Sequence, residues 1–286
     1  MDGELSVGAD LHCHTRMSDG SVGIDELIYL AKRLNITTIS ITDHDTFAGA
    51  KRGMILGKRF GVNVIMGAEV SAFDFERKRR VHILCYLCDN PDRLEGLFKR
   101  ISEERKKTAA IILQKIMRLY PISPEMVSKR AIGGTNIFKQ HIMHALVDAG
   151  YERLIFGELH DKLFNRETGI VKYNIEYPSV YEIIDLIHAS GGLAVLAHPY
   201  KYDSIELMQE LASKKVIDGI EVWSPGHDKE KIEFLSSFAI ENNLVPTGGS
   251  DFHGMYSADS VPLGASSTPV ECLNLLMKKK HKLYSK

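Results

Sequence analysis

Apolar residues recur along the chain in two alternating spacings, one typical of strands and one typical of helices. Short apolar and β-branched runs, such as 37–42 and 193–197, indicate buried strands. Segments with apolar residues every three or four positions, such as 24–34, predict amphipathic helices. We therefore expect strands near 9–15, 37–42, 62–66, 81–87, 193–197, 217–223 and 244–247, and helices near 24–34, 48–60, 178–189, 205–212, 232–239 and 270–282.

One region breaks this alternation. Residues 92–119 form a single charged helical pattern, Ser123 and Pro124 open another helix in the favoured order, and 135–149 predicts a third that Gly150 ends. We expect residues 1–91 and 169–286 to form one α/β domain, and residues 92–168 to form a helical subdomain inserted into it.

Composition narrows the classes of function. The formal net charge is −1 over 286 residues, so there is no general attraction to nucleic acid or membranes, and any anion site must be local. No apolar run approaches membrane-spanning length, and residues 1–8 lack the pattern of a secretion signal. Of four cysteines, Cys85 and Cys88 form a C-x-x-C pair without a second pair, which favours buried, reduced thiols. We expect a cytoplasmic protein.

The first predicted strand carries candidate metal ligands. Side chains at i and i+2 of a strand share a face, so His12 and His14 point the same way, and Asp19 follows in a glycine-containing turn. Imidazole and carboxylate groups in this arrangement suit a divalent cation, although an ordinary pair of hydrogen-bonded histidines would show the same spacing.

The rest of the chain favours the metal. Residues of ligand type lie at or just after predicted strands throughout the alternating region, and Asp251 and His253 repeat the i, i+2 spacing. Nine such groups exceed the need of one tetrahedral ion and suggest two or three ions with bridging carboxylates. They are His12, His14, Asp19, His44, Glu69, His82, His198, Asp251 and His253.

Six ordered motifs resemble the polymerase and histidinol phosphatase (PHP) superfamily of metal-dependent phosphoesterases. They span almost the whole chain and are Asp10-Leu11-His12-Cys13-His14 with Ser18-Asp19-Gly20, Thr42-Asp43-His44-Asp45, Gly67-Ala68-Glu69, Val81-His82-Ile83, Ala197-His198-Pro199 and Ser250-Asp251-Phe252-His253.

The resemblance implies a distorted seven-stranded (β/α) barrel of the TIM type, with two or three Mn, Fe or Zn ions as cofactors. It also implies a division of ligands. His12, His14, Glu69 and Asp251 would hold the first ion, Asp19, His44 and His253 the second, and Glu69, His82 and His198 the third. Asp10, Asp43 and Asp45 are then expected to orient imidazoles rather than bind metal.

The insertion resembles the subgroup that hydrolyses nucleoside 3',5'-bisphosphates and short nucleic-acid 5' ends. That subgroup holds substrate phosphate with an Arg-x-His motif and a basic helix. Here the motif reads Lys139-Gln140-His141, so lysine replaces the bidentate arginine, and Arg105 is the best match on the helix. Arg105, Lys139 and His141 are the expected substrate-binding residues.

The resemblance implies hydrolysis of a small phosphorylated substrate, a nucleotide or short oligonucleotide, by a metal-bridging hydroxide. Neither a membrane nor a stable protein partner is implied. Three alternatives stay open: a histidinol-phosphatase-like monoesterase, an amidohydrolase, whose barrels also begin with His-x-His, and a non-catalytic metal-stabilised binding module.

Overall fold

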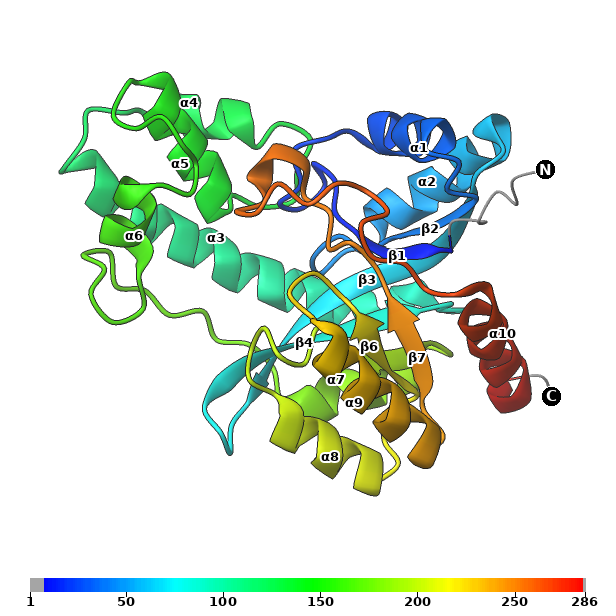
Figure 1. Cartoon of the computed structure of the whole chain (residues 1–286). Helices are drawn as coiled ribbons and strands as arrows, with labels where there is room; N and C mark the ends of the chain where they lie inside the picture. The colour runs from blue at the N-terminus through cyan, green and yellow to red at the C-terminus, as the bar shows by residue number, and fades with distance from the viewer. Residues whose placement is uncertain (1–7, 285–286) are drawn as a thin grey trace.

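The computed structural model describes residues 8–284, which form a seven-stranded barrel with strand order β1 to β7. The sheet curls until β1 meets the segment after β7, where the His14 amide donates to the Phe252 carbonyl (2.8 Å) and the Phe252 amide donates to the His12 carbonyl (3.3 Å). The expected distorted barrel is confirmed (Figure 1). Its strands are β1 (Asp10–Cys13), β2 (Thr38–Ile41), β3 (Asn63–Asp74), β4 (Arg79–Tyr86), β5 (Leu193–Leu196), β6 (Gly219–Trp223) and β7 (Val245–Gly248).

The strands are not all parallel. β4 runs antiparallel to both β3 and β5, whereas the other neighbouring pairs are parallel. The expectation that β3 ends at Met66 is wrong, because β3 continues to Asp74 and pairs with β4 along its length, Gly67 to Tyr86 through Asp74 to Arg79. Glu69 therefore lies within β3. The reversal brings the first half of β4, with His82, to the edge where the parallel strands end.

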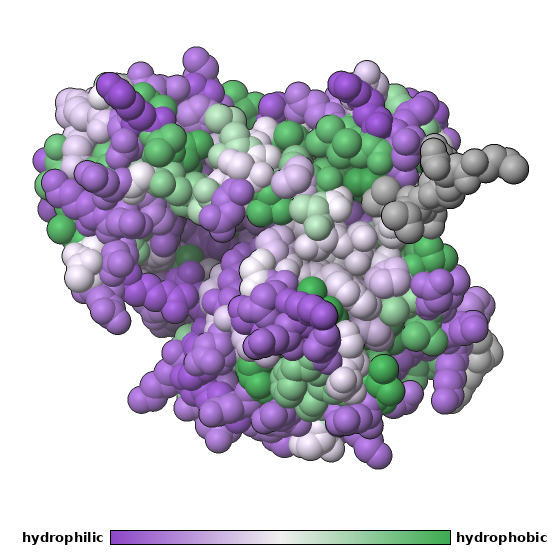
Figure 2. Space-filling model, in the orientation of Figure 1, coloured by the Kyte–Doolittle hydropathy of each residue, from purple (hydrophilic) through white to green (hydrophobic). Residues whose placement is uncertain are grey.

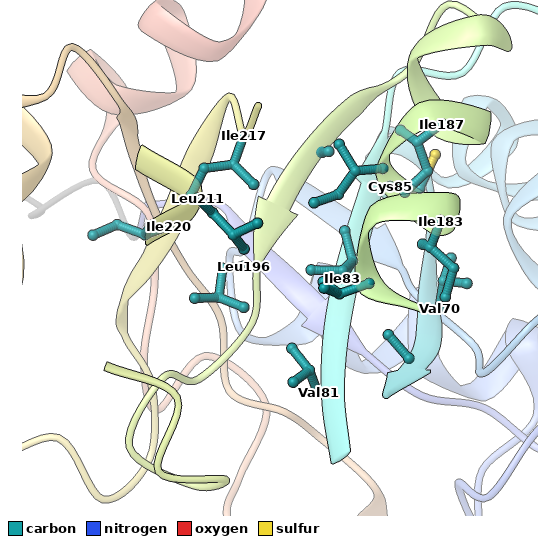
Figure 3. Close-up of a cluster of buried hydrophobic side chains, with 14 of the residues drawn as sticks. Val70, Val81, Ile83, Cys85, Ile183, Ile187, Leu196, Leu211, Ile217 and Ile220 are labelled. Carbon is teal, nitrogen blue, oxygen red and sulfur yellow. The ribbon is translucent and has the colours of Figure 1, made fainter. Parts of the chain in front are cut away.

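Alternation along each strand separates two apolar layers. On β4, Val81, Ile83 and Cys85 face outward into the apolar cluster of Figure 3, which includes Ile183 and Ile187 of α7 (Val180–Ala189), while Leu84 and Tyr86 face the barrel interior. A charged side chain on an interior position is therefore deeply buried, and Glu221 on β6 is fully enclosed.

The helices that lie outside the inserted region cover the outer surface of the barrel (Figure 1). Helix α10 contacts β7, and its Leu276 joins the interior apolar cluster. None of the helices in residues 8–284 combines the length and apolarity needed to cross a membrane. These outer helices are α1 (Ile24–Arg33), α2 (Ala48–Phe60), α7 (Val180–Ala189), α8 (Ile205–Ser213), α9 (Lys229–Glu241) and α10 (Val270–Tyr284), with a short 3-10 turn η2 (Gly254–Tyr256) after β7.

Between β4 and α7 the chain forms the helices η1 (Pro91–Leu94), α3 (Glu95–Met117), α4 (Pro124–Arg130), α5 (Lys139–Asp148) and α6 (Glu158–Phe164). The first half of α3, with Leu97 and Ile101, packs into the barrel cluster. Its second half, with Ile112 and Ile116, packs with α4, α5 and α6 in a separate cluster. Helix α3 therefore belongs to both clusters, and the division into a barrel domain and an inserted subdomain at residues 92–168 stays a prediction. The predicted domain boundaries also include residues 1–7 and 285–286, which lie outside the described residues.

Candidate metal centre and adjoining cavity

The loop after β7 is tied to β1 by one buried carboxylate. Asp10 accepts hydrogen bonds from the Ser250 amide (2.9 Å), the Ser250 hydroxyl (2.6 Å) and the Gly264 amide (2.8 Å). Asp251, the next residue, has a left-handed φ of 48°, an unfavourable conformation for a non-glycine residue. Asp10 thus fixes the strained loop that presents Asp251.

Glu69 stands at the centre of the histidine cluster. Its Oε2 atom lies 3.4, 3.2 and 3.3 Å from the Nε2 atoms of His12, His14 and His44. Its Oε1 atom lies 2.6 Å from His82 Nδ1 and 2.9 Å from His198 Nε2. The two oxygens of one carboxylate therefore face two groups of imidazoles, the arrangement that a bridging ligand requires.

Two further carboxylates, those of Asp19 and Asp251, face histidines of the same cluster. Asp19 Oδ1 lies 3.5 Å from His14 Nδ1 and 3.3 Å from His253 Nε2, and Asp19 Oδ2 lies 3.8 Å from His44 Nε2. Asp251 Oδ1 lies 3.5 and 3.4 Å from the Nε2 atoms of His12 and His14. The structure therefore brings all nine sequence-predicted ligands to one end of the barrel.

The donor set fits divalent cations. His12 Nε2, His14 Nε2, Asp19 Oδ1 and Asp251 Oδ1 are buried without a hydrogen-bond partner among residues 8–284, a costly state that a cation would relieve. Ligand atoms come within 4.8 Å of one another in three groups: His12, His14, Glu69 and Asp251; His14, Asp19, His44 and His253; and His44, Glu69 and His82.

The first group has the membership expected for the first ion. The second group contains His14 from the first group in addition to the expected ligands, and the third group contains His44 from the second. His198 is in none of the three groups and approaches the cluster through Glu69 Oε1. The geometry therefore differs in detail from the expected second and third ligand sets.

Electrostatic interactions keep the Glu69 carboxylate ionised and favour protonation of the His12 and His14 imidazoles, because neighbouring carboxylates raise the pKa of both. Burial by itself raises the pKa of Glu69, but His82, His44 and His12 outweigh it and hold this pKa well below its usual value. Burial lowers the pKa of His14, but Asp251 and Glu69 outweigh it and raise the pKa to about 10. Metal ions would replace those protons.

Glu221 is a functional residue that the sequence analysis missed. Its Oε1 lies 2.9 Å from His12 Nδ1, and its Oε2 accepts a hydrogen bond from the His198 amide (2.7 Å). The second bond fixes His198 at an unusual φ of 24°. A glutamate within the apolar run 219–223 was the available signal, since interior strand positions reject an unpaired charge.

Neither Asp43 nor Asp45 bonds a ligand imidazole directly, and Asp43 approaches one only through the Ser18 hydroxyl, which lies 3.5 Å from His14 Nδ1. Asp43 accepts hydrogen bonds from the amide and hydroxyl of Thr15 and from the Ser18 hydroxyl, each at 2.7 Å. Asp45 binds the Ser71 amide (2.8 Å) and the Arg105 guanidinium. Both carboxylates bind backbone amides and side chains that surround the site.

Two cavities adjoin the cluster and share the walls Asp19, His44, His82, Gln140 and Tyr202. The larger, of about 420 Å³, lies over Glu69, Asp251 and His253. The smaller, of about 190 Å³, extends under α3 and α5 and is called here the side pocket. The face in Figure 2 is hollowed between the inserted helices and the barrel, and hydrophilic residues surround the hollow. The side pocket is lined by the basic residues Arg80, Arg105 and Lys139 and by the aromatic residues Phe138, Tyr173, Tyr177 and Tyr202.

The three expected substrate-binding residues have different surroundings. Lys139 lines the side pocket, with Nζ about 5 Å from the rings of Phe164 and Tyr173 (5.1 and 5.0 Å). Arg105 also lines it, but its Nε (3.1 Å) and Nη2 (2.9 Å) donate to Asp45 Oδ2.

His141 lines neither cavity. Its Nδ1 accepts a hydrogen bond from the Phe138 amide (3.1 Å) at the start of α5, and burial lowers its pKa to about 4, so it is neutral. Its placement does not support the expected direct grip on phosphate. Gln140, which lies between Lys139 and His141 in the sequence, donates from Nε2 to Asp19 Oδ2 (3.3 Å).

Comparisons with known proteins agree with this geometry. The family model for the PHP domain matches residues 10–155. A protein of Eggerthella lenta named phosphoribosyl 1,2-cyclic phosphate 1,2-diphosphodiesterase is 34% identical over 86% of this chain and 94% of its own length. The 5'-3' exoribonuclease Rnm of Escherichia coli is 30% identical over 88% and 87%. A crystal structure from Bifidobacterium adolescentis, described as a metal-dependent phosphoesterase, superposes with a TM-score of 0.86 at 27% identity and covers 95% of this chain and 96% of its own.

Proposed function

The chain belongs to the PHP family and is a metal-dependent phosphoesterase, and from this premise we propose that it hydrolyses a phosphate ester of a ribose that carries a second phosphate. A nucleoside 3',5'-bisphosphate, a 5'-phosphorylated RNA end and phosphoribosyl cyclic phosphate share this feature. The observation that carries the proposal is a basic side pocket that opens beside a cluster of nine metal-type ligands.

We propose that two or three divalent ions, Mn, Fe or Zn, bind the cluster. His12, His14, Glu69 and Asp251 would hold the first, Asp19, His44 and His253 would hold the second, and Glu69, His82 and His198 would hold the third. Bound divalent ions lower the pKa of water and neutralise charge on a phosphoryl group. The shared distances to Glu69 support its role as the bridge.

The chain's own residues orient the substrate around that centre. The scissile ester would lie in the larger cavity, where Lys201, whose Nζ is 2.6 Å from Asp251 Oδ2, adds a positive charge beside the ligand cluster. The second phosphate would enter the side pocket toward Lys139. Because Arg105 is fixed by Asp45 and Ser71, it shapes the pocket and contributes charge without moving.

Four unpaired cysteines are compatible with a reducing compartment, and the cytoplasm is the location that we propose.

A substrate panel tests the proposed activity. Metal-loaded protein is incubated with adenosine 3',5'-bisphosphate, a 5'-phosphorylated RNA trinucleotide, phosphoribosyl 1,2-cyclic phosphate, histidinol phosphate and a carboxamide, and products are separated by anion-exchange chromatography. We expect kcat/KM for at least one ribose with two phosphates to exceed that for histidinol phosphate tenfold or more.

Two controls complete this test. A chelator should abolish turnover and added Mn²⁺ should restore it, while His160→Ala, a histidine outside the cluster, should retain activity. Preference for histidinol phosphate would replace the proposed substrate class, and turnover of only the carboxamide would contradict phosphoesterase activity.

A further inference from the structure

We propose that Arg80, on the barrel strand β4 and not on the inserted helices, is the principal anchor for the phosphate that is not cleaved. The inference rests on the proposed function, because it names the residue that recognises the second phosphate. It assigns to the β3–β4 hairpin a role that the sequence analysis gave to Arg105, Lys139 and His141.

The register of β4 aims Arg80 at the site. Arg80 and His82 are two residues apart on one strand, so their side chains share a face and their Cα atoms lie roughly 7 Å apart. Both side chains line the side pocket. Arg80 is therefore adjacent to a metal-type ligand but displaced from it along the strand, which suits a group other than the scissile one.

Arg80 is also the side-pocket guanidinium with free donors. Among residues 8–284 its side chain has no hydrogen-bond or ion-pair partner; its guanidinium carbon lies 5.4 Å from the centre of the Tyr177 ring, and its charge also acts on Tyr202. Arg105 lies 5.3 Å from the same ring but donates to Asp45 and Ser71. A planar fork held over an aromatic ring and free of carboxylates is well suited to bidentate phosphate binding.

The adjacent residue shows that this placement is specific. Arg79 alternates to the other side of β4 and pairs with Asp203, with 2.6 Å between Nη1 and Oδ2. It lines neither cavity. Arg79 therefore provides a matched control of the same residue type, on the same strand and with similar partial exposure.

The size of the side pocket limits its ligand. About 190 Å³ is below the roughly 300–1,000 Å³ of a pocket that encloses a whole small molecule. It suits a phosphate and the adjacent part of a sugar, while the rest of the substrate occupies the larger cavity over the metal-type ligands. The ligand that the candidate substrates share is a ribose 5-phosphate unit, bound by Arg80 with Lys139 as the second cation.

Kinetics provide the first test, with Arg80→Met, Arg80→Lys and the control Arg79→Met. On adenosine 3',5'-bisphosphate, Arg80→Met should lower kcat/KM about 10- to 150-fold, the worth of a charge-assisted contact to phosphate. The loss on p-nitrophenyl phosphate should be at least tenfold smaller. Arg80→Lys should fall between wild type and Arg80→Met, since it keeps the charge and loses the fork. Arg79→Met should match wild type on both substrates. Equal losses on both substrates, or wild-type behaviour of Arg80→Met, would overturn the proposal.

A binding measurement separates this proposal from the proposed activity. Ribose 5-phosphate is titrated calorimetrically into the metal-loaded wild type and the three variants. Weaker binding of ribose 5-phosphate by Arg80→Met, but not by Arg79→Met, would support the role of Arg80 as the phosphate anchor. If in addition none of the esters in the panel is cleaved, only the proposed activity fails. Equal affinities in all four proteins would reject the anchor even if the bisphosphate is hydrolysed.

Discussion

Replacing Glu221 with glutamine tests whether a residue that touches no substrate controls the first metal site. Glu221 Oε1 accepts from His12 Nδ1, which keeps a proton on Nδ1, so that Nε2, which faces Glu69 and Asp251, is the nitrogen that would bind a cation. Its Oε2 accepts from the His198 amide. Glutamine has nearly the same shape, but one acceptor becomes an NH₂ group, which would face a donor.

The structure sets the expected magnitude. Glu221 and His12 are both fully buried, so water cannot replace the lost acceptor. Loss of the partner behind a metal-binding histidine typically costs 10- to 100-fold in metal affinity or activity, or about 1.4–2.7 kcal/mol. Glu221→Gln should therefore bind its most tightly held ion 10- to 100-fold more weakly, and kcat/KM at limiting metal should fall in parallel.

The assay is competition for Mn²⁺ or Zn²⁺ against a chromophoric chelator, with thermal unfolding of the chelated proteins as a check on folding. Glu233→Gln on α9, which removes an exposed carboxylate 3.7 Å from Lys229, is the control and should match wild type. Metal affinity of Glu221→Gln within twofold of wild type would refute the reasoning.

Three further outcomes follow from the cluster. His14→Ala should lower kcat by at least 100-fold and reduce the metal content while the fold survives, because it removes a ligand shared by two groups of the cluster. Full activity with unchanged metal content would contradict this assignment. His198→Ala should deplete the third ion and leave the first pair at least partly occupied, and anomalous scattering that still shows three full peaks would exclude its role as a ligand. The His14 pKa is raised to about 10, so at pH 7.5 the metal-free protein carries a proton on His14 that metal binding should release. The apparent metal affinity should therefore rise as the pH approaches 10. Calorimetry in buffers of different ionisation enthalpy measures the number of protons released, and a value of zero would disprove this prediction.

Local pattern predicted the alternating strands and helices and placed the nine ligand-type residues at or after strands, whereas the seven-stranded barrel was expected from the resemblance to the PHP family. Strand periodicity placed His12 and His14 on one face, and motif order supplied the other ligands. The strand reversal escaped prediction because a short turn between β3 and β4 gives no pattern that distinguishes a hairpin from the end of a parallel strand. Glu69 was therefore expected after a strand rather than within one.

The surroundings of the site could not be predicted for a different reason. Arg80 and Gln140 acquire their places at the site from contacts between residues far apart in the sequence, and residue type alone does not distinguish them from surface residues. Glu221 had a signal in its apolar surroundings, but its partners His12 and His198 are known only from the fold. His141 shows the converse: a motif position suggested contact with substrate, but the helix start it belongs to uses its ring as a hydrogen-bond acceptor. Charge and spacing identify candidates, and the fold determines their partners.

The length of α3 determines where its side chains point. Because β4 is reversed, the chain leaves it at the end of the barrel remote from the ligand cluster, where the Asn90 amide bonds the Ser190 carbonyl before β5. The 23 residues of α3 then rise about 34 Å and pass the cluster at Arg105. A one-residue insertion between Ile101 and Arg105 would rotate everything beyond it by about 100°, turning the guanidinium away from Asp45, whereas seven residues would restore the angle to within about 20° but shift it by roughly 10 Å. The angular phase and the height of this helix are therefore fixed together, so insertions and deletions should be rejected within the first half of α3.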